Sequence, residues 1–214
     1  MQHKVRYAKV MATIAAFVTL AGVVSVTAAW AEIRLLPNDF RWPPVLEPGT
    51  YQTQPFFTPR TTFTVGRGWN GGQETHSFWG VGKGLNGHLA TPCGSIPRES
   101  VDAVGICVFR LALPYTTAVS RFKMLTTLTA GPSKRIQIGG YPGVSFHAAV
   151  PDDRSLLRGM GVALPAGVLP GGQQIFLNIR GTTLLLRIET SARDAGEEAA
   201  VRGLLRTMRF PRDG

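Results

Sequence analysis

Residues 175–190 read IFLNIRGTTLLLRIET, and this stretch decides which fold the sequence predicts. Gly181 lies between two runs of mostly apolar residues, which is the pattern of a β-hairpin with a tight glycine turn. Ile175, Leu177 and Ile179 alternate with other residues, so they lie on one face of the first strand. The stretch therefore predicts two antiparallel strands that share a buried apolar face.

Further strand patterns precede this hairpin. Residues 61–65 and 76–81 have the composition of half-buried strands. Residues 106–113 form a near-continuous apolar run, which is typical of a central strand. Residues 136–150 predict another hairpin, with a glycine-rich turn at 139–143.

Two segments have the spacing of helices. Apolar residues recur at intervals of three between 115 and 129, which predicts a short amphipathic helix. Nearer the C-terminus, Asp194 and Glu197 form a capping-box pair at a predicted helix start. A buried stripe follows, made of Val201, Leu204, Leu205 and Met208. Residues 208–210 then predict a short edge strand, and the whole order predicts an α+β domain with a mainly antiparallel sheet and one or two packed helices.

The N-terminus has the pattern of a secretory signal peptide. A cationic start precedes an uncharged, mostly apolar stretch at 10–26, and the small-residue site Ala29-Trp30-Ala31 follows. We therefore expect residues 1–31 to be removed on export, with an uncleaved membrane anchor as the alternative. No transmembrane segment is expected after cleavage.

The remaining chain is long enough for one domain. Residues 32–50 contain four prolines and predict an extended entry segment, and residues 51–214 predict a single α+β domain. The formal net charge of the chain is +10, which favours contact with anionic surfaces. Because the cationic residues are scattered, a merely basic surface is the alternative, and no nucleic-acid partner is expected.

The sequence contains two cysteines, Cys93 and Cys107. An even number of cysteines in an exported domain predicts a disulfide bond, which stabilises such a loop by about 3 kcal/mol in the chain-entropy model. The alternative is a thiol nucleophile, which would need a nearby base and a reducing compartment.

Several motifs resemble an uncharacterised family of secreted proteins from actinobacteria and Chloroflexi. The resemblance is carried by residues 46–53, 57–59, 62–65, 68–69, 138–146 and 208–210, together with the hairpin at 175–190. The order of elements is also similar to that of PsbP-like α+β sandwiches, and the resemblance implies a binding or assembly role. It assigns no catalytic residue, and His147 stands where the family often has an acidic residue.

The sequence offers weak candidates for catalysis and none for a cofactor. Ser145 and His147 lie two residues apart on a predicted strand, so their side chains share a face. A catalytic triad would need an acid such as Asp152 or Asp153. The glycine-rich motif at 66–71 matches a dinucleotide fingerprint only in letters, because a strand pattern rather than a helix follows it.

The sequence also bears on whether the protein binds a metal or a small ligand. The histidines His76, His88 and His147 lack the close spacing of zinc ligands, so no metal site is expected. Residues 151–174 predict a connection over one sheet edge or a flap over an apolar pocket. The ligand-binding candidates are Trp69 in the glycine-rich turn, and Arg154 and Arg158 in the segment 151–174.

These observations favour a non-enzymatic binding or interaction module at the cell envelope. Its partner would be an envelope protein, a glycan or an anionic polymer. One alternative is a small secreted hydrolase that uses Ser145 and His147. Another is an electrostatic binder of anionic envelope polymers or lipid surfaces, whose affinity would fall with salt.

The first prediction concerns the mature chain. We expect N-terminal sequencing of the exported protein to begin at Glu32, because the small-residue site ends at Ala31. Mass spectrometry should also detect the hydrogens gained when one disulfide is reduced. If the protein still begins at Met1 and is found in the membrane fraction, the N-terminal segment is instead a retained anchor.

Overall fold

The computed structural model describes residues 32–39, 43–84, 103–125, 132–147, 172–190 and 195–211. All of them belong to one compact unit, Glu32–Gly214. Strands dominate, and two helices, α2 (Tyr115–Leu125) and α4 (Ala195–Thr207), complete the secondary structure of the described ranges. The predicted α+β class is confirmed.

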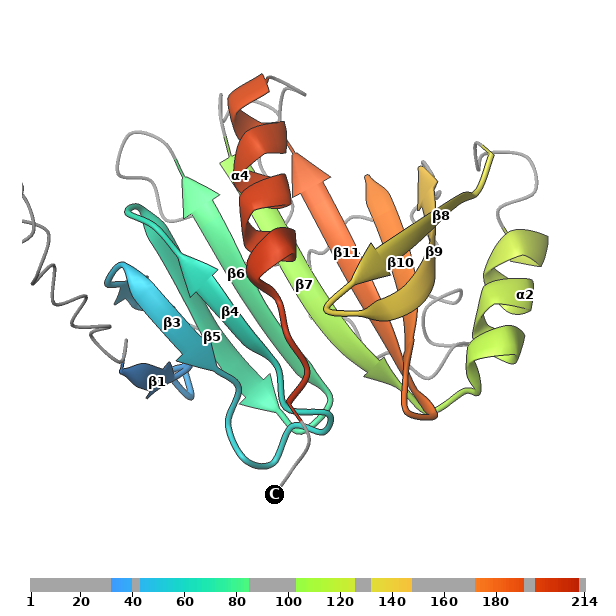
Figure 1. Cartoon of the computed structure of the whole chain (residues 1–214), viewed down its shortest axis with the longest axis horizontal. Helices are drawn as coiled ribbons and strands as arrows, with labels where there is room; N and C mark the ends of the chain where they lie inside the picture. The colour runs from blue at the N-terminus through green and yellow to red at the C-terminus, as the bar shows by residue number, and fades with distance from the viewer. Residues whose placement is uncertain are drawn as a thin grey trace, which may run out of the picture. The chain divides into compact units, whose positions relative to one another are not determined.

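An eight-stranded antiparallel sheet forms the centre of the fold (Figure 1). Its order from edge to edge is β2 (Val45–Leu46), β5 (Trp69–Thr75), β6 (Phe78–Gly84), β7 (Ala103–Leu111), β11 (Thr182–Thr190), β10 (Gln173–Ile179), β9 (Tyr141–His147) and β8 (Lys134–Ile138). The apolar run at 106–113 thus supplies a central strand, β7, as predicted. The edge strand β8 carries two exposed cations, Lys134 and Arg135.

A second, three-stranded sheet contains β1 (Ile33–Leu35), β3 (Gly49–Gln52) and β4 (Thr62–Val65). β1 pairs with β3 in parallel, and β3 pairs with β4 antiparallel. The segment at 32–50 therefore contributes strands to both sheets. Its side chains Leu36 and Leu46 are only 0% and 2% exposed, so the hydrophobic core begins before residue 51.

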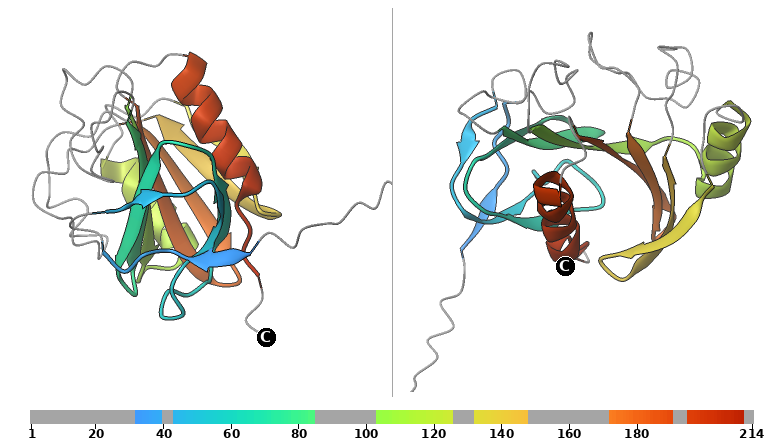
Figure 2. Two further views of the ribbon diagram at one scale, coloured as in Figure 1. Left: turned by 90° about the vertical axis from the view of Figure 1, so that its left-hand side faces the viewer. Right: turned by 90° about the horizontal axis from the view of Figure 1, so that it is seen from above.

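The large sheet is strongly curved, and α4 packs on its concave face (Figure 2, right). Val201, Leu204 and Met208 of the predicted helical stripe are buried, which confirms that stripe. Phe63 of the small sheet stacks on Trp79 of the large sheet, with ring centroids 4.8 Å apart and planes 3° from parallel. One concave core therefore joins both sheets and α4.

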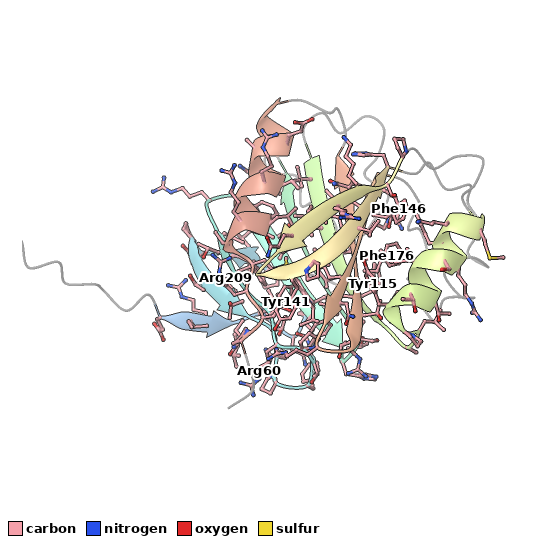
Figure 3. All side chains as sticks on the ribbon, turned by 45° about the vertical axis from the view of Figure 1, so that its right-hand side comes forward. Arg60, Tyr115, Tyr141, Phe146, Phe176 and Arg209 are labelled. Carbon is pink, nitrogen blue, oxygen red and sulfur yellow. The ribbon has the colours of Figure 1, made fainter. Side chains whose placement is uncertain are left out.

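The convex face carries α2 and a second core. Phe122 of α2 is buried, and its ring centroid lies 5.2 Å from those of both Phe146 and Phe176. Figure 3 shows Phe146 and Phe176 beside α2. Burial of each phenylalanine contributes about 1.5–3 kcal/mol relative to exposure, so these rings account for the docking of α2. The last residues of the predicted helix, 126–129, lie outside the described ranges.

The hairpin at 175–190 has the predicted form. Arg180 and Gly181 form its two-residue turn with φ angles of 52° and 87°, and Asn178 Oδ1 accepts a hydrogen bond of 3.0 Å from the Gly181 N–H. Two successive positive φ values match the right-handed twist of the strands. Ile175 and Ile179 lie in the concave core, which confirms the predicted buried face.

The hairpin at 136–150 differs from the prediction. Its turn consists of Gly139 and Gly140 alone, so the longer turn predicted at 139–143 is wrong. Gly143 lies inside β9 opposite Leu177 of β10. A Cβ at this position would overlap the carbonyl oxygen of Phe176 and lie 2.5 Å from Leu177 Cδ2. Glycine is thus needed here for close strand approach rather than for a turn.

The chain after α4 returns to the small sheet. Arg209 forms an isolated bridge with Thr62, through hydrogen bonds of 2.8 and 2.9 Å. The predicted edge strand at 208–210 is therefore reduced to one bridge. Phe210 is buried and meets Tyr141 edge to face, with ring centroids 5.7 Å apart, so the Phe210 ring packs against the β8–β9 hairpin.

The second prediction tests the close approach at Gly143. Gly143→Ala is expected to lower the free energy of unfolding by about 1–3 kcal/mol, because the added methyl group overpacks the β9–β10 contact. Gly203→Ala is the control, since Gly203 is exposed on α4 and a methyl group added there would have no atom within 4 Å. The control should raise stability by about 0.5–1 kcal/mol. Urea unfolding measures the stability of both variants. A Gly143→Ala variant as stable as Gly203→Ala would contradict the packing account.

Candidate functional site

A hollow of about 490 Å³ lies between α4 and the concave face of the large sheet, and we call it the helix–sheet hollow. Its described lining residues come from β9, β10, β11 and α4: His147, Gly172, Gln173, Ile188, Glu198, Val201 and Arg202. Strand pairing explains why they meet. Gln173 stands opposite His147 on β9 and opposite Ile188 on β11. Directly opposed residues point to the same face, so all three side chains face α4.

A hydrogen bond fixes the floor of this hollow. Gln173 Nε2 donates to Ser145 Oγ across 2.8 Å. Ser145 is 5% exposed, whereas His147 is exposed. The amide oxygen of Gln173 and the imidazole of His147 thus form the polar wall on the sheet side.

The helix side of the hollow carries an ion pair. Arg202 Nη1 lies 3.0 Å from Glu198 Oε2, one helical turn away, as the i, i+4 spacing predicts. Both side chains are more than half exposed, at 57% and 58%. An exposed pair of this kind contributes only about 0.3–0.5 kcal/mol to stability, so either group is free to exchange its partner for a ligand.

The structure brings the two weak catalytic candidates to the same region but not into hydrogen-bond contact. Ser145 and His147 share the concave face, as predicted, and His147 lines the hollow. Residues two apart on a strand are separated by about 6.6 Å and project in parallel. The Ser145 hydroxyl instead receives its hydrogen bond from Gln173. The proposed acids Asp152 and Asp153 lie outside the described residues.

The predicted ligand-binding residues do not form this site. Trp69 is 4% exposed and belongs to the concave core, which argues against a ligand contact at Trp69. The cause is that Tyr51, Phe63 and Val65 of the small sheet are buried in the same core as Trp69. Arg154 and Arg158 lie outside the described residues, as does the segment 151–171.

The structure describes one of the two cysteines, Cys107. Cys107 is 1% exposed in the convex core and is not a free thiol, which argues against a thiol nucleophile there. Cys93 lies outside the described residues, so the Cys93–Cys107 pairing stays a prediction.

Among the residues that the structure describes, no group of three potential ligands could hold a metal ion. None of the helices in the same ranges is long and apolar enough to cross a bilayer.

Sequence reasoning missed Gln173, Glu198 and Arg202 as parts of one site. Gln173 reads as an ordinary first residue of a strand, and Glu198 and Arg202 read as a solvated helix face. No family model matches this chain, and no curated protein matches it. The resemblance to secreted actinobacterial and Chloroflexi proteins therefore stays a prediction.

The third prediction concerns the floor of the hollow. Ser145→Ala removes the acceptor of the Gln173 amide and is expected to lower the free energy of unfolding by about 1 kcal/mol. The control Gln137→Ala removes an exposed hydrogen bond of 3.3 Å to the Gly140 carbonyl, and should change stability by no more than about 0.5 kcal/mol. Chemical denaturation distinguishes the two. A Ser145→Ala variant as stable as the unaltered protein would show that the bond does not hold Gln173 in place.

Proposed function

We propose that the protein is an exported, non-enzymatic binding module whose ligand occupies the helix–sheet hollow. The observation that carries the proposal is the mixed lining of this hollow. It combines the amide of Gln173, the imidazole of His147 and the Glu198–Arg202 ion pair. Such a set offers donors and acceptors from four side chains around one volume.

Size and charge define the ligand class. A volume of about 490 Å³ falls within the ~300–1,000 Å³ of small-ligand sites. Ile188 and Val201 supply apolar contact, and the carboxylate of Glu198 offsets the guanidinium of Arg202. The described lining therefore suits a small polar ligand of low net charge, such as a short neutral segment of an envelope glycan. Adjacent sugar hydroxyls, which both donate and accept, match this lining.

The hydrolase alternative has less support. A serine nucleophile needs a base within hydrogen-bond reach and an approach for substrate. Ser145 is nearly inaccessible and accepts its hydrogen bond from an amide, which cannot act as a general base. The shared face of Ser145 and His147 is the single observation in favour of this alternative.

Export, envelope location and the Cys93–Cys107 disulfide are parts of the same proposal. They are supported by the N-terminal signal pattern, by the burial of Cys107 and by its status as a non-free thiol. A PsbP-like arrangement would agree with a binding role, but fold analogy says nothing about the ligand. The alternative of purely electrostatic surface binding differs in one measurable respect, because salt would abolish it.

The fourth prediction locates the ligand. Thermal unfolding of the purified protein with a panel of neutral sugars should show stabilisation by one class, since a ligand at a hundred times its dissociation constant adds about 2.7 kcal/mol. Arg202→Ala should lose this stabilisation. Arg206→Ala should keep it, because Arg206 is an exposed arginine one turn along the same helix and does not line the hollow.

Three outcomes would contradict the proposed function. Stabilisation that survives in both Arg202→Ala and Gln173→Leu would place the ligand elsewhere. Turnover of an ester or glycoside substrate that is lost in Ser145→Ala, with unfolding still cooperative, would favour the hydrolase. Stabilisation that disappears on addition of salt would favour the electrostatic binder.

A further inference from the structure

A second hollow, of about 640 Å³, lies at the opposite end of the large sheet, and we call it the strand-end hollow. It is lined by the β5–β6 turn, the end of β7 and the β10–β11 turn, which lie at the same end of the sheet in Figure 1. On β11 it includes Thr182 and Thr183, whereas the helix–sheet hollow includes Ile188 farther along the strand. The two hollows share no described lining residue.

The polar groups of the strand-end hollow are cations and hydroxyls. Arg110 and His76 are its cationic or potentially cationic residues, and Ser77, Thr182 and Thr183 supply hydroxyl groups. No acidic residue is among its described lining residues. The backbone N–H of Arg110 donates to the Ser77 carbonyl across 2.8 Å, so the β5–β6 turn is held against the end of β7.

Arg110 is well placed to carry charge toward a ligand. It is half-buried at the end of a central strand, and within the described ranges it forms no ion pair with a carboxylate. A guanidinium group presents a planar set of N–H donors that fits the oxygens of phosphate or sulfate. Partial burial also lowers the local dielectric, which strengthens its attraction for an anion.

Thr183 provides an independent indication of a ligand. Its side chain is 1% exposed, and its Oγ1 has no hydrogen-bond partner in the described structure. Buried hydroxyl groups normally have a partner, because desolvation without a hydrogen bond is unfavourable. Thr183 lines the hollow, so its hydroxyl is available to donate a hydrogen bond to an oxygen of a bound anion.

The start of α2 lies next to the strand-end hollow in the chain. Leu113 and Pro114 line the hollow, and α2 begins at Tyr115. The first turn of α2 contains no acidic side chain, and the N–H of Ala118 donates to the Pro114 carbonyl across 2.9 Å. The preceding N–H groups and the positive end of the helix dipole favour an anion. Burial raises the pKa of Tyr115, so its phenol adds no negative charge at neutral pH.

The strand register places these groups on two sides of the hollow. Arg110 stands opposite Leu184 of the concave core. Thr183 stands opposite Leu111 of the convex core, on the face that carries α2. A ligand bound across the end of the sheet would therefore have Thr183 and the start of α2 on one side and Arg110 on the other.

We infer that the strand-end hollow binds an oxyanion group, a phosphate or a sulfate. Arg110 is its charge partner, and the Thr183 hydroxyl and the start of α2 are its hydrogen-bond donors. This site is independent of the ligand proposed for the helix–sheet hollow. The same phosphate chemistry occurs in free phosphate and in the phosphodiester units of envelope polymers, and both can be offered to the protein separately.

The test measures binding of inorganic phosphate to the full protein by calorimetry, with sodium chloride at equal ionic strength as the reference. We expect saturable binding that Arg110→Gln weakens at least tenfold. Arg135→Gln is the matched control, because it removes the same charge from an exposed position on β8 and should leave the affinity unchanged. Thr183→Val keeps the side-chain shape and should weaken binding several-fold without lowering the unfolding midpoint.

Further measurements keep the inference open to refutation. Phosphate-induced amide shifts in the unaltered protein should centre on residues 76–77, 110–118 and 182–183, which gives an answer even if a variant misfolds. Glycerol phosphate oligomers that bind more tightly than inorganic phosphate would identify a polymer as the source, and equal affinity would identify free phosphate. The inference would be overturned by a lack of saturable phosphate binding or by an equal effect of chloride at matched ionic strength. It would also be overturned by amide shifts centred on other residues, or by an unchanged phosphate affinity in Arg110→Gln.

Discussion

The pairing of β7 with β11 is the interaction on which the rest of the fold depends. These strands lie side by side in the middle of the large sheet, and each is buried on both faces. Val108 stands opposite Leu186 on the concave face, and Phe109 stands opposite Leu185 on the convex face. Both helices therefore pack on strands that this single ladder holds together. Residues of β11 line both hollows, one towards each end of the strand, so the length of β11 sets the spacing between the hollows.

The elements predicted well from the sequence are those whose pattern is local. The hairpin at 175–190 and the stripe on α4 follow from periods of 2 and 3.6 residues. The errors arise where a residue responds to a distant strand. Gly143 looks like a turn glycine, but it lies in a strand because β10 approaches its backbone closely. Trp69 lies within a glycine-rich motif that resembles a surface turn, yet the concave core encloses its side chain.

The candidate sites show the same division between local and distant effects. The sequence predicts that Ser145 and His147 share a face, because strand side chains alternate. It does not predict that Gln173 takes the Ser145 hydroxyl as its acceptor, since the two residues are 28 positions apart and meet only through the β9–β10 register. The same holds for Arg110 and Thr183, which belong to separate strands with hydrophobic patterns. An arginine and a threonine in such strands do not indicate a binding site by themselves. They do so only once the topology places both at the same end of the sheet.

The cationic edge strand β8 has a consequence for how the protein behaves in crowded surroundings. Backbone groups at the edge of a sheet can pair with a strand of another molecule and start aggregation. Lys134 and Arg135 are exposed on β8, so a second copy added edge to edge would bring like charges together. β2, at the other edge, has only two residues and offers a short template. The open sheet is thus protected at both margins against strand-by-strand growth into fibrils.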